Sequence, residues 1–222
     1  MQIIPAKTPG FVKTLFPYFV WHIDTKQKDL FLTFDDGPTP EITTWVLEQL
    51  SACNAKATFF CIGNNIENYP ELFEAILSEG HTVGNHTYNH LKGWKHKTKI
   101  YVEDIEKTQS LIRSKIKILN SKSSHLKFTE SNFFRPPYGK LKTKQSKKIQ
   151  ELGYKIVMWD VLSYDWDKSI SADACFNTVI STATEGSIVV FHDSVKAFEN
   201  LKHILPRVLN YYKERGFSFK SL

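Results

Sequence analysis

The sequence predicts a single-domain α/β fold built on a parallel sheet. Short apolar runs alternate along the chain with longer amphipathic patterns, and a chain that returns to a parallel strand needs a helical crossover of this kind. The length of 222 residues fits one domain. Hydrophobic residues make up 41% and charged residues 23%, which is ordinary for a globular protein and argues against disorder.

Seven segments rich in Val, Ile, Phe and Thr are expected to form strands, and Gly or Pro borders several of them. They are Leu30–Phe34, Ala57–Ile62, Thr82–Asn85, Asn132–Pro136, Lys155–Val161, Ser187–His192 and Phe217–Ser221. Seven strand–helix units could close into a slightly irregular barrel or form an open doubly wound sheet, and the pattern leaves both open.

Amphipathic patterns between these segments predict helices. Examples are Glu41–Leu50, Pro70–Glu79, Ile100–Ile116, Lys142–Leu152, Ala172–Thr182 and Leu201–Arg215. Pro70 opens a helix where its missing N–H costs nothing, and Gly80, Gly153 and Gly216 follow helices at the usual C-terminal glycine position. The polar segment Leu119–Ser131 is expected to be a surface excursion, because the strand–helix alternation resumes after it.

The three cysteines, Cys53, Cys61 and Cys175, are odd in number and show no CxxC spacing. They are expected to be free, buried, apolar residues in a reducing compartment. The apolar stretch Leu15–Trp21 is too short to span a membrane and contains Pro17, so we expect neither a signal peptide nor a membrane span. These observations predict a cytoplasmic protein.

The net charge of +6 is unevenly distributed. The stretch 92–148 holds sixteen Lys or Arg residues against four acidic residues, a local net charge of +12. One interpretation is a solvated helical face with a lysine-rich loop. The other is a surface for an anionic partner such as an acidic glycan or a lipid phosphate. Nucleic acid is disfavoured, because no recognised nucleic-acid-binding motif accompanies the charge.

Two polar motifs follow predicted strands early in the chain. Asp35 and Asp36 end an apolar strand before a Gly-Pro breaker. Adjacent carboxylates repel each other unless a cation intervenes, although Asp-Gly alone is typical of a plain turn. His86 and His90 are four residues apart, so they lie on one face if the segment is helical, and both imidazoles could then reach one metal ion. Each motif alone is a weak signal.

Three further motifs also follow apolar strands. Arg135 precedes two prolines and Tyr138, a rigid turn that could aim a backbone N–H at a developing oxyanion. Asp165 and Trp166 follow the next strand, and His192 ends the strand after that. A lone His in such a place is usually structural. Five such motifs at the same ends of parallel strands predict an active site, because parallel α/β enzymes build their sites there.

These motifs in this order (TFDDG, H-T-x-x-H, R-x-P-Y, D-W and the strand-end His) resemble the polysaccharide deacetylase family, carbohydrate esterase family 4. The resemblance covers roughly Leu30–Leu222. It implies a distorted (β/α) barrel of about seven parallel strands and metal-dependent removal of N-acetyl or related acyl groups from an amino-sugar glycan or sugar precursor. It also implies a catalytic domain over residues 30–222, preceded by an N-terminal extension, residues 1–29, that packs on the barrel.

The resemblance further implies roles for individual residues. Asp36, His86 and His90 would bind the metal, expected to be Zn²⁺, although another divalent transition metal is possible. Asp35 would be the base and His192 the acid, with Arg135 and Asp165 holding them. The substrate-binding residues would be Tyr138, Pro137, Trp166 and Val190.

The chain departs from the family pattern at Leu162, where the family often has Asp, and at Val190, where it usually has Leu. The expected partner is a carbohydrate, and a membrane-associated sugar precursor is possible. The alternative function is a catalytically silent, metal-containing barrel that binds a glycan or lipid. The sequence leaves the glycan, the acyl group and the oligomeric state open.

Overall fold

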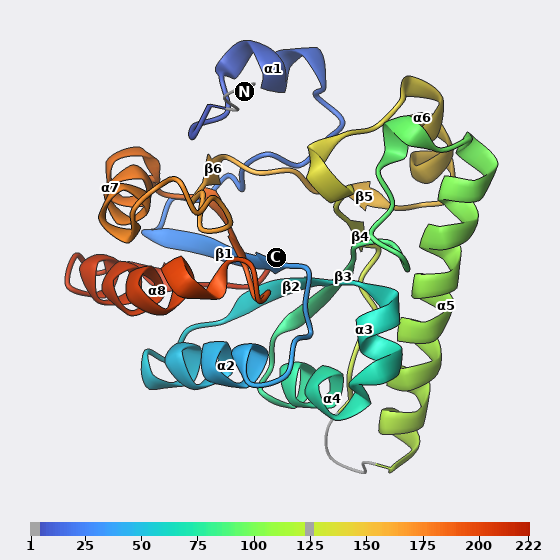
Figure 1. Cartoon of the computed structure of the whole chain (residues 1–222), viewed down its shortest axis with the longest axis horizontal. Helices are drawn as coiled ribbons and strands as arrows, with labels where there is room; N and C mark the ends of the chain where they lie inside the picture. The colour runs from blue at the N-terminus through green and yellow to red at the C-terminus, as the bar shows by residue number, and fades with distance from the viewer. Residues whose placement is uncertain (1–4, 123–126) are drawn as a thin grey trace.

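The computed structural model describes residues 5–122 and 127–222, and its strands form one curled parallel sheet (Figure 1). The strand order is β5-β4-β3-β2-β1-β7-β6, and β8 pairs separately with β1. The strands are β1 (Asp29–Asp35), β2 (Ala57–Cys61), β3 (Thr82–Asn85), β4 (Phe133–Phe134), β5 (Lys155–Ile156), β6 (Val161–Leu162), β7 (Ile188–His192) and β8 (Ser218–Phe219). The distorted barrel expected from the family resemblance is confirmed, and the open doubly wound sheet is wrong.

The sheet must curl because its two end strands are neighbours in the chain. Only the four residues 157–160 separate β5 from β6, and the five Cα–Cα steps from 156 to 161 reach at most about 18 Å. The N-terminal segment bridges the remaining gap between these strands. Val20 hydrogen-bonds to the backbone of Ile156 and Met158, and Thr8 donates its N–H to the carbonyl of Asp160. Residues 5–23 thus complete the barrel wall.

One predicted strand, Lys155–Val161, is wrong as a single element because it divides into β5 and β6. The backbone between them is used elsewhere. The Met158 N–H donates to the carbonyl of Val20, and the guanidinium of Arg135 donates to the carbonyls of Val157 and Met158. The Met158 N–H and the carbonyls of Val157 and Met158 thus bond the N-terminal segment and a side chain in place of a neighbouring strand.

Helices surround the sheet (Figure 1). They are α1 (Gly10–Leu15), α2 (Ile42–Ala52), α3 (Gly63–Asn68), α4 (Pro70–Ser78), α5 (Thr98–Lys122), α6 (Thr143–Glu151), α7 (Ala172–Thr182) and α8 (Phe198–Lys213). Two short 3₁₀ turns are η1 (Gly93–Lys95) and η2 (Pro137–Gly139). In the described ranges, 5–122 and 127–222, none of the helices has both the length and the apolar character that crossing a bilayer requires.

Helix α5 continues past its predicted end at Ile116 to Lys122, so the start predicted for the polar excursion, Leu119, is wrong. Ile112, Ile116 and Leu119 are all buried, and their spacing keeps one face of the helix on the core to Lys122. Residues 123–126 of that predicted excursion lie outside the described residues. The helices α1 and α3, each six residues long, were not expected from the sequence.

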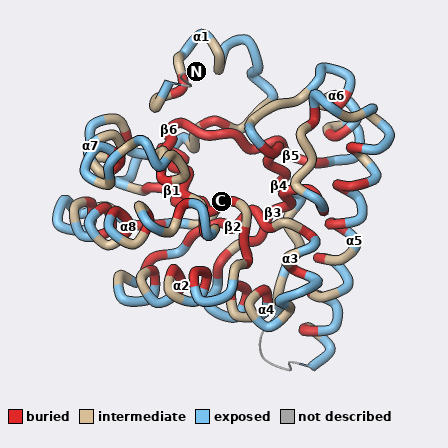
Figure 2. The backbone as a smooth tube through the Cα atoms, in the orientation of Figure 1, coloured by how far each residue is buried: buried red, intermediate tan, exposed pale blue. Residues whose placement is uncertain are grey.

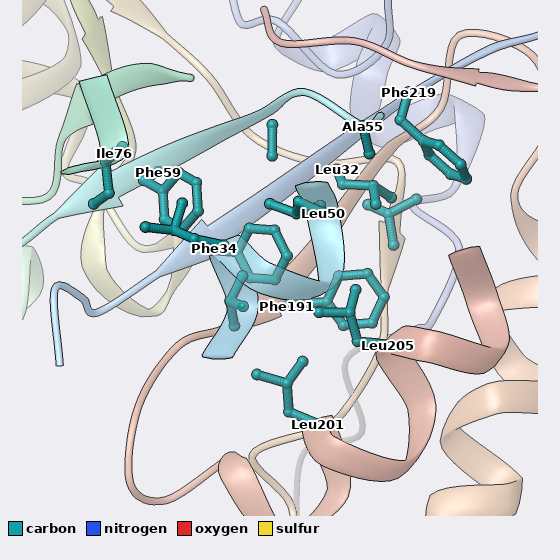
Figure 3. Close-up of a cluster of buried hydrophobic side chains, with 14 of the residues drawn as sticks. Leu32, Phe34, Leu50, Ala55, Phe59, Ile76, Phe191, Leu201, Leu205 and Phe219 are labelled. Carbon is teal, nitrogen blue, oxygen red and sulfur yellow. The ribbon is translucent and has the colours of Figure 1, made fainter. Parts of the chain in front are cut away.

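The strand β1 shows how the sequence separates core from site. Its alternate residues face opposite sides of the sheet. Leu30, Leu32 and Phe34 face the helices, and Phe34 stacks with Phe59 and Phe191 at centroid distances of 5.1 and 5.8 Å (Figure 3). The intervening Thr33 and Asp35 point into the barrel, where both bond Arg135. Figure 2 shows the buried strands ringed by helices whose outer sides are exposed.

The cysteines are free, as expected. Cys61 and Cys175 are buried, whereas Cys53 is half-buried at the end of α2. Burial raises the pKa of the Cys175 thiol to about 11 and also raises that of Cys61, so neither thiol is reactive near neutral pH.

Candidate metal and catalytic centre

The loops that follow β1, β3, β4, β6 and β7 meet at the carboxyl end of the barrel. They enclose much of a cavity of about 360 Å³, a size typical of small-molecule sites. Its lining residues are Asp35, Asp36, His86, His90, Lys92, Pro136, Tyr138, Gly139, Lys140, Trp159, Leu162, Trp166, Val190, His192 and Lys196. The five predicted motifs are therefore brought together, because each directly follows a strand of one parallel sheet.

Asp36, His86 and His90 form a candidate metal site. Asp36 Oδ1 lies 3.1 Å from His90 Nε2 and 3.5 Å from His86 Nε2, and the potential ligand atoms of all three lie within 4.8 Å of one another. Two ligand atoms about 2.1 Å from a tetrahedral zinc ion would lie about 3.4 Å apart. The spacing therefore fits one small divalent cation.

The tautomer of His86 also suits a ligand. Its Nδ1 lies 2.8 Å from the carbonyl oxygen of Arg135, and because a carbonyl only accepts, Nδ1 carries the proton. The lone pair is then on Nε2, which faces Asp36, in the arrangement that usually supports metal-bound imidazoles.

Asp36 is held in its ionised form. Burial raises the pKa of Asp36, but the adjacent His86 and His90 rings and the nearby charge of His192 lower it by more. The net pKa lies well below the ordinary value, so the site offers a cation a carboxylate at neutral pH.

The two histidines do not lie on a helix, and that expectation is wrong. The chain after β3 forms an irregular loop in which Thr87 and His90 adopt positive φ angles of 63° and 53°. Asp36 and Tyr138 also have positive φ, 80° and 60°. Such conformations are costly for residues other than glycine and cluster at functional sites. The loop still turns both imidazoles toward Asp36.

Asp104 on α5 holds this histidine loop and was missed in the sequence. Its carboxylate accepts the backbone N–H groups of Tyr88 and Asn89, at 2.8 and 3.0 Å, and the Asn89 side-chain amide at 2.6 Å. Asp104 is buried, and it lies fifteen residues from Asn89 in the sequence. An acid in an amphipathic helix pattern gives no local sign of such a contact.

We expect Asp104→Ala to weaken metal binding by about 10- to 100-fold, the usual effect of losing an outer partner of a metal site. It should also lower the free energy of unfolding by about 1–3 kcal/mol, because two backbone N–H groups lose their acceptor. Competition with a chelator and a thermal melt would measure both effects. The neighbouring exposed Glu103→Ala is the matched control, and an equal effect there would contradict the role of Asp104.

Asp35 is buried against Arg135. Arg135 Nη1 donates to Asp35 Oδ1 at 2.7 Å and to Thr33 Oγ1 at 2.7 Å. The guanidinium is fully buried, and it also donates to the carbonyls of Met158 and Val157 and stacks over Phe60 at 4.1 Å. These hydrogen bonds hold the Arg135 guanidinium in one position, and the guanidinium in turn fixes the position of the Asp35 carboxylate.

His192, which is partly buried, and the buried Asp165 form a second pair. Asp165 Oδ1 lies 2.9 Å from His192 Nδ1, and Asp165 Oδ2 accepts the His192 backbone N–H at 2.7 Å. Burial lowers the pKa of His192, whereas the charge and hydrogen bond of Asp165 and the charges of Asp36 and Asp35 raise it, to a net value of about 9. The imidazole is therefore protonated at neutral pH.

Asp193 braces the turn that carries Asp35 and Asp36 and was also missed as a site residue. It accepts the Gly37 N–H at 3.1 Å and the Thr43 hydroxyl at 2.6 Å. A Cβ on Gly37 would lie 2.0 Å from the Asp193 carboxylate, so only glycine fits there. Burial raises the pKa of Asp193 to about 8.

The four predicted substrate residues lie in or beside the cavity. Tyr138, Trp166 and Val190 line it, and the Trp166 ring stands edge-on to His192 at a centroid distance of 4.8 Å. Pro137 is buried and does not line the cavity, whereas Pro136 does. Of the remaining lining residues, Trp159 and Leu162 add an apolar wall, and Leu162 lies opposite Val190 in the sheet register.

Comparisons with known proteins agree with this arrangement. Residues 22–157 match the family described as polysaccharide deacetylase. A peptidoglycan-N-acetylglucosamine deacetylase of Bacillus cereus is 35% identical over 195 residues, which are 87% of this chain and 66% of that protein. The peptidoglycan-N-acetylmuramic acid deacetylase PdaC of Bacillus subtilis is 32% identical over 171 residues, which are 77% of this chain and 33% of that protein.

The fold is also similar to that of a solved structure. The crystal structure of the Bc1960 peptidoglycan N-acetylglucosamine deacetylase, in complex with 4-naphthalen-1-yl-N-oxidanyl-benzamide, superposes with a TM-score of 0.81 at 32% identity. The match covers 96% of this chain and 94% of that one. By its sequence, its barrel and its ordered motifs, the chain belongs to the polysaccharide deacetylase family, carbohydrate esterase family 4.

Proposed function

We propose that this protein is a metal-dependent hydrolase that removes N-acetyl groups from the amino sugars of a peptidoglycan-type glycan. One observation carries the proposal: a potential ligand trio, the buried carboxylate of Asp35 and the imidazole of His192, which is paired with Asp165, line one cavity. Relatives named as peptidoglycan deacetylases support the substrate class. The catalytically silent barrel is disfavoured, because both residues suited to proton transfer are present.

Asp36, His86 and His90 would hold the cation. One carboxylate and two imidazoles, with no thiolate among the lining residues, favour zinc and leave open coordination positions. When bound, the ion would acidify a water molecule and polarise the acyl carbonyl.

Asp35 is proposed as the general base. It takes a proton from the water that attacks the amide carbonyl, and Arg135 keeps its carboxylate oriented. The backbone N–H of Tyr138, on the rigid Pro136-Pro137 turn, is proposed to donate to the developing oxyanion.

His192 is proposed as the general acid. Asp165 keeps it protonated, and as the C–N bond breaks it gives that proton to the departing amine, so the products are acetate and a free amino sugar. Trp166, Val190 and Leu162 are proposed to enclose the methyl group of the acetyl.

Metal analysis tests the proposal directly. We expect about one zinc ion per chain in protein purified without chelator, and almost none in an Asp36→Ala/His86→Ala double variant, because one imidazole cannot hold the ion alone. Zinc content would be measured beside release of acetate from N-acetylated glycan oligomers. Metal without acetate release would favour the silent barrel, and undiminished metal in the double variant would contradict the ligand assignment.

A further inference from the structure

We propose that one side of the cavity is a subsite for an anionic sugar that adjoins the sugar being deacetylated. This side, called the lysine–aromatic wall, is formed by Lys92, Tyr138 and Lys140, which line the cavity, and by Trp94, which contacts Lys140 outside the lining. The inference rests on the function proposed above and adds a chemical class of substrate to it: a glycan with a negative charge next to the reacting N-acetyl sugar.

The wall begins at the candidate metal site. The ring of Tyr138 lies 4.8 Å from the ring of His90, centroid to centroid, and Lys92 Nζ lies 4.4 Å from the Tyr138 centroid. Tyr138 is 50% exposed, and Lys92 also lines the cavity. The Lys92 ammonium therefore contacts the Tyr138 ring, which in turn contacts the potential metal ligand His90. In the proposed subsite, the sugar next to the reacting one lies beside this ammonium.

The wall continues outward through Lys140 and Trp94. Lys140 lines the cavity, and its Nζ lies 4.7 Å from the centroid of the Trp94 ring. Trp94 is 57% exposed, and its indole N–H already donates to the carbonyl of Leu141 at 3.0 Å. An exposed, oriented aromatic surface with its polar atom satisfied suits packing against the apolar face of a sugar.

Buried contacts hold the two loops of the lysine–aromatic wall in place. The buried Gln145 side chain donates to the carbonyl of Gly93 at 2.9 Å and accepts the N–H of Lys142 at 2.9 Å. A Cβ on Gly93 would lie 2.7 Å from the carbonyl oxygen of Lys140, so the two loops touch at the backbone. The turn that carries Trp94 is thus clamped to the loop that carries Lys140.

The charge of the wall points to an anion. In the described parts of the chain, no acidic side chain forms a salt bridge with Lys92 or Lys140. The two acids of the cavity, Asp35 and Asp36, are already paired with Arg135 and the histidines. A ligand carboxylate or phosphate would complete the pairing. The group proposed is the carboxylate, which N-acetylmuramic acid carries on its lactyl group where no peptide is attached.

The test compares Lys92→Gln/Lys140→Gln with Lys117→Gln/Lys147→Gln. The second pair removes the same charge from the same basic stretch, at exposed positions of α5 and α6 outside the cavity. The substrates are an oligomer of alternating N-acetylglucosamine and N-acetylmuramic acid, its carboxyl methyl ester, and a chito-oligosaccharide with and without a terminal phosphate. Binding by calorimetry and kcat/KM are both measured, at low and high salt.

We expect the parent to prefer the free acid over its ester and to lose this preference as salt screens the charges. The ratio of kcat/KM for acid over ester should fall about fivefold to tenfold in Lys92→Gln/Lys140→Gln and stay unchanged in Lys117→Gln/Lys147→Gln. A preference for the phosphate alone would move the charge recognition to a phosphorylated precursor and overturn the carboxylate assignment.

Equal ratios in the parent and Lys92→Gln/Lys140→Gln, or an equal loss in the control pair, would overturn the subsite. Failure of the proposed function looks different, because no acetate would be released from any substrate. The calorimetric ratio of acid to ester binding would still decide whether the wall recognises an anion.

Discussion

Asp35→Asn is expected to lower kcat by about 100- to 10,000-fold, the usual contribution of a general base. The amide cannot take a proton from water, although it keeps the shape of the carboxylate and can still accept from Arg135. The loss should appear in kcat more than in KM, because the group acts during the reaction and not in substrate binding. Steady-state kinetics of acetate release would measure it.

Two controls make this result specific. Zinc content should stay at the parent level, because Asp35 lies outside the ligand trio. Loss of zinc would mean that Asp35 shares the role assigned to Asp36. A thermal melt shows whether the buried Arg135 tolerates a neutral partner, and Asp29→Asn, at the other end of β1, should leave kcat unchanged.

Asp165→Asn is expected to shift the alkaline limb of the pH–rate profile to lower pH. With Asp165 present, the pKa of His192 is about 9, and the charge and hydrogen bond of Asp165 are the largest causes that raise it, so Asp165→Asn should move this pKa down toward the ordinary value of 6.5. At a pKa of 6.5 the protonated fraction at pH 8 would be about 3% instead of about nine-tenths, so kcat/KM at pH 8 should fall by up to about 30-fold. Below pH 6 the loss should be much smaller.

The sign of this effect follows from which form of His192 works. A general acid must be protonated, so activity is present below its pKa and is lost as the pH rises through it. The same raised pKa stabilises the folded protein fully below about pH 6.5, and this contribution is lost as the pH rises through about 9. The partly exposed Asp167→Asn is the matched control, and an unchanged alkaline limb in Asp165→Asn would contradict the role of the pair.

Much of the site could be predicted from the sequence because its residues directly follow strands. Asp35 and His192 each end a strand rich in apolar residues, and Arg135 follows one. Parallel strands bring such ends to one edge, so the position along the chain is enough to gather the residues. The helical geometry assumed for His86 and His90 was wrong, because a four-residue spacing does not distinguish a helix from a tight loop.

The supporting residues could not be predicted, because their partners lie far away in the chain. Asp193 reaches Gly37 across 156 positions, and Asp104 holds a loop from a neighbouring helix. Neither acid differs in its local pattern from an exposed one. The same holds for the basic stretch 92–148, in which Lys92 and Lys140 line the cavity while Lys117 and Lys147 do not.

By itself, the sequence determined the alternation of strands and helices, the apolar face of each and the polar residues that follow the strands. These properties are local, since periodicity and turn residues act over a few positions. Only the tertiary structure decided how the barrel closes, with Val20 and Thr8 bridging β5 and β6, and which acids and lysines surround the site. Those contacts depend on the order and curl of the strands, which no short segment of the chain encodes.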